Sequence, residues 1–139
     1  MEKVDFQVNE EDRKDIIKRT YKFALRILYI VNKLPKNVLT YRLIDQLVGR
    51  GTAIGSNTEE ASAGFSKSDF TYKMSIASKE ARETNYFLRL LRDSGLIKEN
   101  SLFKEIVDGI DESNQIKKIL TSVVKTSQAK MEIKKSKSQ

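Results

Sequence analysis

The sequence predicts an all-α protein that folds as an antiparallel up-down-up-down four-helix bundle. Its 139 residues contain a single proline, Pro35, and many residues that favour helices, such as leucine, lysine, glutamate and alanine. Apolar residues recur at helical spacing in four long segments of the chain. The connections between these segments are short, which favours antiparallel packing of neighbouring helices.

The ends of the four helices follow from residues that cap or interrupt helices. Asn9 is suited to cap the first helix, because Asp12 follows three residues later. Pro35 ends that helix, since proline biases the preceding residue away from helical geometry. We expect helices at about 10–34, 39–64, 67–93 and 100–126 in one bundle domain (1–126), followed by a lysine-rich C-terminal tail (127–139).

The second helix carries glycines in its interior, at Gly49, Gly51 and Gly55. Each interior glycine costs up to about 1 kcal/mol relative to alanine. A helix that keeps these residues must therefore gain its stability from packing. We expect a neighbouring helix to approach its backbone closely along this stretch.

The fourth helix, for which Asn100 or Ser101 is the expected cap, has two apolar stripes. They consist of Phe103, Ile106, Val107 and Ile110 in the first half and of Ile116, Ile119, Leu120 and Val123 in the second. At 100° per residue the two stripes lie roughly 140° apart around the helix. Two explanations remain open at this point. Either the helix kinks near Ser113, or its second half faces a second partner.

The composition excludes several classes of catalytic chemistry. The chain has no cysteine, which excludes thiol nucleophiles, disulfides and thiolate metal sites. It has no histidine, so it lacks the commonest general base and the commonest metal ligand. The segment Gly49-Arg50-Gly51 lacks the spacing of a phosphate-binding loop. We therefore expect no enzymatic activity, no cofactor and no metal.

Glutamates on the second and third helices have the pattern of a carboxylate metal site in a bundle. Such sites combine their glutamates with Glu-x-x-His pairs, which a chain without histidine cannot form. We interpret these acids instead as members of ion networks, within one subunit or between subunits. The candidate residues for such a network or for an oligomer interface are Arg50, Asn57, Glu60, Glu80, Arg82 and Glu83.

The net charge of +7 is concentrated at one end of the chain. Residues 117–139 hold seven lysines and one acid, Glu132, whereas the rest of the chain holds 19 basic and 18 acidic residues. Basic residues also recur every four positions on the first helix, where Tyr29 could stack on a base. Basic surfaces of this kind fit a phosphate backbone, although a charged helix face is most often simply solvated. The candidate nucleic-acid-binding residues are Lys14, Lys18, Lys22, Arg26, Lys130, Lys134 and Lys135.

The N-terminal segment is acidic and polar and has no apolar run behind it, so it does not have the pattern of a secretory signal. No stretch approaches the roughly 20 apolar residues that a membrane span needs. We expect a cytoplasmic protein without a membrane partner.

Two blocks of the sequence resemble the signature of a bacterial protein family. The first block comprises Gln46-Leu47, Gly51-Thr52-Ala53-Ile54-Gly55-Ser56-Asn57 and Glu59-Glu60-Ala61. The second comprises Ser66, Asp69-Phe70, Ile76-Ala77, Lys79-Glu80-Ala81-Arg82-Glu83-Thr84 and Tyr86-Phe87-Leu88. In combination they are similar to the 23S rRNA intervening-sequence proteins, and the resemblance covers about residues 10–125.

The resemblance implies an antiparallel four-helix bundle that assembles as a homopentameric ring without enzymatic activity. It also implies a distant similarity to the accessory variability determinant of diversity-generating retroelements, a basic pentameric bundle that binds nucleic acid and reverse transcriptase. Some family members are encoded inside sequences inserted in large-subunit rRNA genes, which favours RNA as the ligand.

Charge and resemblance together predict a non-enzymatic, oligomeric protein that binds nucleic acid through basic side chains, with RNA favoured over DNA. The alternative is an oligomeric scaffold or adaptor that binds a protein partner and has no nucleic-acid role.

Overall fold

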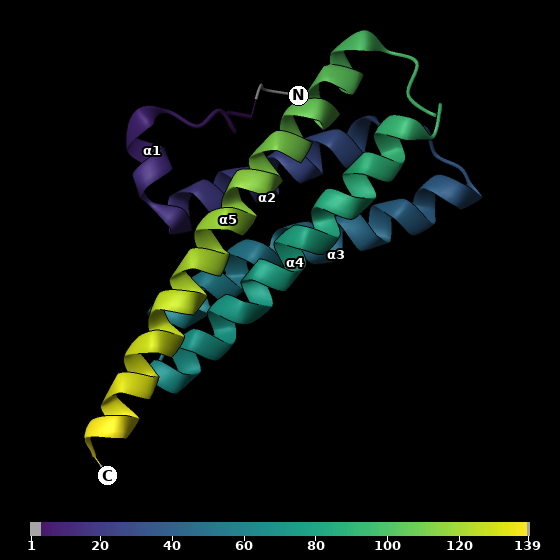
Figure 1. Cartoon of the computed structure of the whole chain (residues 1–139). Helices are drawn as coiled ribbons and strands as arrows, with labels where there is room; N and C mark the ends of the chain where they lie inside the picture. The colour runs from purple at the N-terminus through teal and green to yellow at the C-terminus, as the bar shows by residue number, and fades with distance from the viewer. Residues whose placement is uncertain (1–3, 139) are drawn as a thin grey trace.

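The computed structural model describes residues 4–138, and its regular elements are all α-helices (Figure 1). These helices are α1 (Glu10–Lys14), α2 (Ile16–Lys33), α3 (Val38–Ser62), α4 (Lys67–Asp93) and α5 (Asn100–Lys137). The all-α class predicted from the sequence is therefore confirmed.

The four long helices form a closed cycle of contacts. Each helix from α2 to α5 packs on the next one in the chain, and α5 packs on α2 in turn. Within the described residues, no Cα atom of α2 lies within 8 Å of one in α4, and the same holds for α3 and α5. This arrangement is consistent with a helical bundle, while the exact up-down-up-down order stays a prediction.

The fully buried side chains of the core come from all four long helices. Most of them lie one or two helical turns apart along their helix, as an amphipathic pattern requires. The largest of them are Phe23, Ile27, Ile30, Leu47, Ile54, Leu88, Leu91, Ile106, Ile116 and Leu120.

The first helix differs from the expected continuous helix over 10–34, because the chain breaks at Asp15. Asn9 forms the expected cap, a capping box with Asp12 that starts α1. Asp15 has an extended backbone, and its carboxylate accepts hydrogen bonds from the N–H groups of Ile17 and Lys18 at 3.1 and 3.2 Å. This second cap starts α2, and the short helix α1 packs on α2. Lys14 therefore lies on a different helix from the other predicted cations.

The glycines of α3 are explained in part by the close approach of α2. A Cβ atom on Gly51 would lie 2.8 Å from Cγ1 of Ile27, and one on Gly55 would lie 3.4 Å from the carbonyl oxygen of Thr20. Gly49 differs from both, since no described atom lies within 4 Å of its Cβ position. Close packing therefore requires a glycine only at Gly51, since a Cβ atom on Gly55 would make an ordinary van der Waals contact.

Helix α5 runs without interruption through Ser113, and its buried face is continuous. The helix therefore does not break near Ser113, and Ile106 and Ile116, one from each apolar stripe, share this buried face. The buried face passes through small and polar residues, namely Gly109, Glu112 and Ser113, whereas Phe103 and Val107 are 38 % and 40 % exposed. These two residues lie on the outer side of the helix. Its N-cap is Glu99, which makes no capping side-chain hydrogen bond, rather than Asn100 or Ser101.

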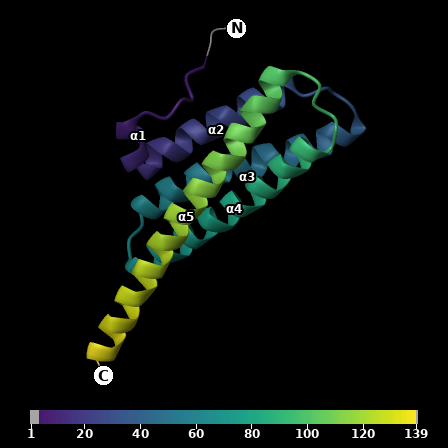
Figure 2. The same ribbon diagram turned by 45° about the horizontal axis from the view of Figure 1, so that its top comes forward.

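The C-terminal lysines belong to a helix, because α5 continues to Lys137 instead of ending near 126. The buried hydroxyl groups of Ser127 and Thr71 are hydrogen-bonded, which holds this part of α5 against the start of α4. Its last turns project beyond the other helices in both views (Figures 1 and 2). Lysines that were expected on a tail therefore have helical spacing.

Candidate nucleic-acid interface

The predicted basic stripe of the first helix is largely used within the fold. The ammonium group of Lys22 lies 2.7 Å from Oδ2 of Asp12 and donates to the carbonyl oxygen of Gln7 at 2.9 Å. The Lys22 hydrogen bond and the N–H of Asn9 hold the pKa of the Asp12 carboxyl below its usual value. The same hydrogen bond raises the pKa of Lys22. Lys22 therefore ties α1 to α2.

Arg26 is buried and pairs with Glu105 of α5 at 2.9 Å. Its guanidinium group also lies over the ring of Phe6, 4.8 Å from the ring centroid. Tyr29, the aromatic residue expected to stack on a base, packs against Phe6 with ring centroids 5.1 Å apart. Arg26 is therefore used within the fold, and Phe6 occupies one side of the partly buried Tyr29 ring.

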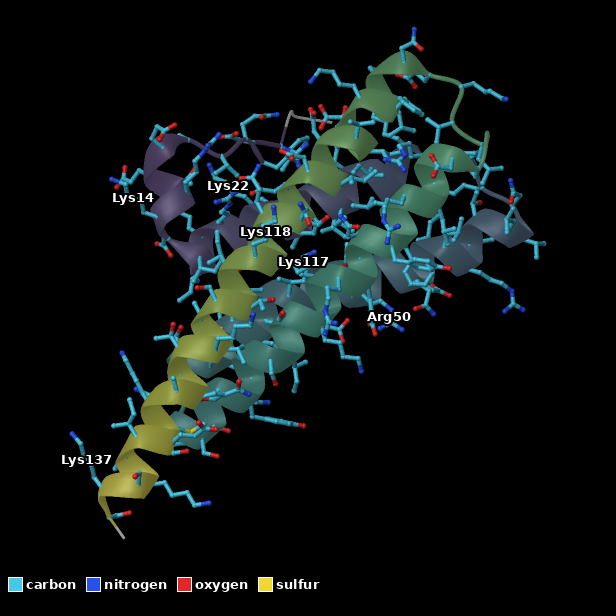
Figure 3. The ribbon with its side chains drawn as sticks, viewed as in Figure 1. Lys14, Lys22, Arg50, Lys117, Lys118 and Lys137 are labelled. Carbon is cyan, nitrogen blue, oxygen red and sulfur yellow. The ribbon has the colours of Figure 1, made fainter. Side chains whose placement is uncertain are left out.

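The remaining predicted cations are exposed but lie far apart. Lys14 is on α1, and Lys18 lies 3.5 Å from Oδ1 of Asp12 with a side chain 55 % exposed. Lys130, Lys134 and Lys135 are exposed on the last turns of α5. Figure 3 shows how far Lys14 and Lys22 lie from Lys137 at the free end of α5. The predicted set therefore does not form one surface.

Three residues of the predicted ion network come together between α3 and α4. The guanidinium group of Arg50 forms an ion pair with Glu83 and lies 3.6 Å from Oε2 of Glu80. Gln46 accepts a further hydrogen bond from Arg50 at 2.9 Å.

The other three residues of that network stay apart from this cluster. Asn57 donates to the carbonyl oxygen of Ala53 within α3. Glu60 and Arg82 are exposed. Any part that the six residues play in an oligomer interface stays a prediction.

A separate group of cations lies on α5 and the neighbouring part of α4. Lys117, Lys118 and Lys125 are on α5, where Figure 3 labels the first two, and Arg82 is on α4. A cavity of about 460 Å³ between the two helices is lined by Arg82, Lys117 and Lys125. A second cavity, of about 410 Å³, is lined by all three lysines. We call these four cations and the surface around them the basic face.

Hydroxyl groups lie among these cations in both cavities, whose lining residues include no carboxylate. Ser75, Ser78 and Thr121 line the larger cavity, and the hydroxyl groups of Ser78 and Thr121 lie 2.9 Å apart. No aspartate or glutamate occurs in the sequence between Glu112 and Glu132. Among residues 4–138, the four cations of the basic face take part in no ion pair. The basic face is therefore a hydrogen-bonding surface with uncompensated positive charge.

Lys117, Lys118 and Lys125 were counted in the sequence as part of the charge excess but were not selected as site residues. The signal that could have indicated them is the stretch without acidic residues between Glu112 and Glu132. This stretch was divided between the predicted helix and the predicted tail, because the helix was expected to end at 126. Arg82 was instead predicted to belong to the ion network. Its position beside these lysines could not be predicted, because it depends on how α4 packs on α5.

The comparisons with known proteins identify the family. The family model described as 23S rRNA-intervening sequence protein matches residues 12–122. The chain belongs to this family. The family match ends before Lys125, so the last turns of α5 lie outside it.

A crystal structure from Bacteroides thetaiotaomicron is similar in fold and sequence. It is described as a protein with unknown function from the S23 ribosomal protein family. It is 32 % identical to this chain with a TM-score of 0.66, and the match covers 79 % of this chain and 98 % of that chain. No curated protein matches the sequence.

None of the helices within residues 4–138 combines the length and the apolar character needed to cross a membrane. In the same range, no group of three or more acidic residues is arranged to hold a metal ion.

Proposed function

We propose that this member of the 23S rRNA-intervening sequence protein family is a non-enzymatic, oligomeric protein that binds nucleic acid, with RNA favoured, through its basic face. The observation that carries the proposal is the group of Arg82, Lys117, Lys118 and Lys125 around two cavities, without a carboxylate partner in the described chain. Uncompensated lysine and arginine side chains bind the phosphates of a nucleic acid by electrostatic attraction.

The hydroxyl groups of the basic face support a phosphodiester ligand. Protein–nucleic acid interfaces take many of their contacts from lysine and arginine together with serine and threonine hydroxyls, which donate to phosphate oxygens. The cavity between α4 and α5 offers both types of donor within one hollow. The family description, which refers to 23S rRNA, is the reason for favouring RNA.

Exposed apolar residues on two parts of the bundle support oligomerisation. Phe103 and Val107 lie exposed on α5. An apolar groove of about 540 Å³ lies between α2 and α3, and Leu25, Leu28 and Tyr41 are among its lining residues. Surfaces of this kind mark protein–protein contacts. We call Phe103 and Val107 the ridge on α5. A ridge on one part of a subunit and a groove on another fit a head-to-tail contact, which can close into a ring.

A ring would also strengthen nucleic-acid binding. Several copies of the basic face on one assembly would contact one strand at several points, which raises the affinity without new contacts in each subunit.

The experiment is a fluorescence-anisotropy titration of labelled RNA with the full-length protein between 50 and 300 mM salt. The variant Lys117→Gln/Lys125→Gln removes two cations from the basic face. We expect it to bind several-fold more weakly and to lower the slope of log affinity against log salt by about 2.

The control variant Arg42→Gln/Lys98→Gln removes the same charge from two exposed residues elsewhere. It should bind as the wild type does. Absence of binding by the wild type at 50 mM salt would contradict the proposal and favour the scaffold alternative. Equal losses in the two variants would also contradict it, because the net charge and not the basic face would then determine binding.

A further inference from the structure

The outer side of α4 carries two parallel rows of residues at a spacing of seven. One row is Tyr72, Lys79 and Tyr86, and the other is Ser75, Arg82 and Arg89. Seven residues make almost two full helical turns, so each row follows the helix axis. Arg82 and Arg89 of the second row lie four residues before and three residues after Tyr86, so both are its neighbours on the helix surface. The acids of this helix stretch, Glu80 and Glu83, pair with Arg50 towards α3 instead.

Tyr86 is held in a fixed setting although its side chain is half exposed. The residue is 50 % exposed, and its ring meets Phe87 edge-on with centroids 5.4 Å apart. The guanidinium group of Arg89 lies 5.7 Å from the centroid of the Tyr86 ring. Ordered packing of this kind lowers the entropy lost when another ring stacks on Tyr86.

The hydrogen bonds of Asn85 connect this aromatic site to α5. Asn85 accepts a hydrogen bond from Arg89 at 2.9 Å. Its own amide nitrogen donates to the Ile110 carbonyl oxygen and to the Ser113 hydroxyl, both at 3.0 Å. The arginine beside Tyr86 is therefore tied to the helix that carries the lysines of the basic face.

Arg82 links the aromatic site to the basic face. It lines the cavity that Lys117 and Lys125 also line. It lines a second cavity as well, of about 500 Å³, whose other lining residues are Arg50, Lys79, Glu83, Tyr86 and Phe87. Glu83 is paired with Arg50 there, so Arg82 and Lys79 remain, within the described chain, as unpaired cations beside the two rings. One arginine thus borders both a surface suited to phosphates and a surface suited to a flat ring.

We propose that the ligand of the basic face is single-stranded RNA, with phosphates bound near Arg82, Lys117 and Lys125 and an unpaired base stacked on Tyr86. This inference rests on the proposed function and names its ligand more closely. Single strands are bound by cationic grooves together with aromatic side chains on which bases stack. Bases in a duplex are stacked on one another, so a duplex could use the cations but not the tyrosine.

The other tyrosines do not offer the same combination. Tyr29 is packed against Phe6 in the N-terminal segment. Tyr21 and Tyr41 are exposed, but they lie on α2 and α3 rather than on α4 or α5. Tyr72 is 62 % exposed, and about 21 Å of helix separates it from Tyr86 on the same row. Tyr86 is therefore the residue to test first.

The experiment compares an unstructured single-stranded 20-nucleotide RNA with the duplex of the same sequence, using the full-length protein at 100 mM salt. We expect the wild type to bind the single strand at least about 10-fold more tightly than the duplex. Tyr86→Leu should weaken single-strand binding between about 5-fold and about 150-fold, the range measured for loss of one stacked base. Duplex binding and the salt dependence should be unchanged by this substitution.

Two matched variants check the cause of the loss. Tyr86→Phe keeps the ring and should retain wild-type binding. Tyr21→Leu removes a tyrosine of similar exposure from α2 and should have no effect on the single-strand affinity. Because Tyr86 is half exposed, the Leu variant should keep the wild-type circular dichroism spectrum.

The outcomes separate this inference from the proposed function. Equal affinity for single strand and duplex, or an unchanged affinity of Tyr86→Leu, would overturn single-strand recognition. If binding still depended on salt and on Lys117 and Lys125, the proposed function would stand. Failure of the wild type to bind any RNA or DNA would overturn both.

Discussion

At the scale of single residues, burial decides what each cation does. Arg19 is buried and makes two hydrogen bonds to the Glu112 carboxylate, at 2.9 and 2.7 Å, and one to Gln115. Arg26 has a similar position beside Glu105. These arginines connect α2 to α5, so they serve folding rather than binding.

The Arg19–Glu112 pair gives a sharp prediction for stability. The side chains of Arg19 and Glu112 are only 5 % and 11 % exposed. Glu112→Gln leaves a buried guanidinium group without its counter-ion, and we expect the free energy of unfolding to fall by about 3–5 kcal/mol. Urea denaturation followed by circular dichroism measures this change.

A double replacement shows whether the loss of stability comes from the unpaired buried charge or from the lost hydrogen bonds. In Arg19→Met/Glu112→Leu both charges are replaced by apolar groups of similar size, and the loss should shrink to within about 1 kcal/mol of the wild type. A double variant as unstable as the single one would mean that the hydrogen-bond geometry, and not the unpaired charge, controls the stability.

The sequence could not separate binding cations from structural ones. Lys22 and Arg26 follow Lys14 and Lys18 at intervals of four, and this periodicity predicts one basic stripe on a single helix. It gives no sign of Phe6, which covers Arg26, or of Glu105, which pairs with it from a helix 79 residues further along the chain. Such partners become visible only once α2 and α5 are placed side by side.

At the scale of helices, local signals predicted most beginnings and ends. The capping box of Asn9 and the break at Pro35 were read correctly, since both act through neighbouring residues. The cap at Asp15 was missed because the apolar spacing continues across it. The end of α5 was placed too early, because the contact of Ser127 with Thr71 is a tertiary contact.

The buried face of α5 shows the limit of apolar periodicity. Ser113 belongs to this face because Asn85 of α4 donates a hydrogen bond to its hydroxyl, and Glu112 belongs to it because of Arg19. A polar residue enters a core where another helix supplies its partner. A pattern of apolar residues alone therefore gave two stripes instead of one.

The glycines of α3 give a paired prediction at this scale. Gly51→Ala places a methyl group 2.8 Å from Cγ1 of the fully buried Ile27, so the helices must shift apart. We expect a loss of about 1–3 kcal/mol in the free energy of unfolding, as for other overpacked sites. Gly49→Ala meets no described atom and should stabilise the helix by up to about 1 kcal/mol.

Thermal and urea unfolding of the two variants would check this pair. Equal destabilisation by both substitutions would show that α2 does not lie as close to Gly51 as described. Loss of oligomers in Gly49→Ala alone would instead place Gly49 in a contact between subunits.

At the scale of the whole molecule, the all-α class and the family could be predicted from the sequence. Both rest on features that the chain carries locally, namely helical periodicity and the two signature blocks of α3 and α4. The basic face could not be predicted in this way. Arg82 and Lys117 are distant in the sequence, and they border one cavity only because α4 packs on α5.

The last prediction concerns the proposed assembly, and it tests the ridge on α5 and the groove between α2 and α3 separately. Val107 is 40 % exposed on the ridge, and Leu28 is 44 % exposed in the groove. A glutamate at either position should leave the bundle folded but should reduce the assembly to monomers, because each substitution buries a charge in an apolar contact. Light scattering coupled to size-exclusion chromatography measures the mass of each variant.

A mixture of the two variants reveals whether the contact is head-to-tail. The Val107→Glu protein keeps its groove, and the Leu28→Glu protein keeps its ridge, so one intact contact can form between them and nothing can add to it. We expect the equimolar mixture to contain dimers and no larger species. A monomeric wild type would contradict the assembly itself, and variants that keep the wild-type mass would show that subunits meet through other surfaces.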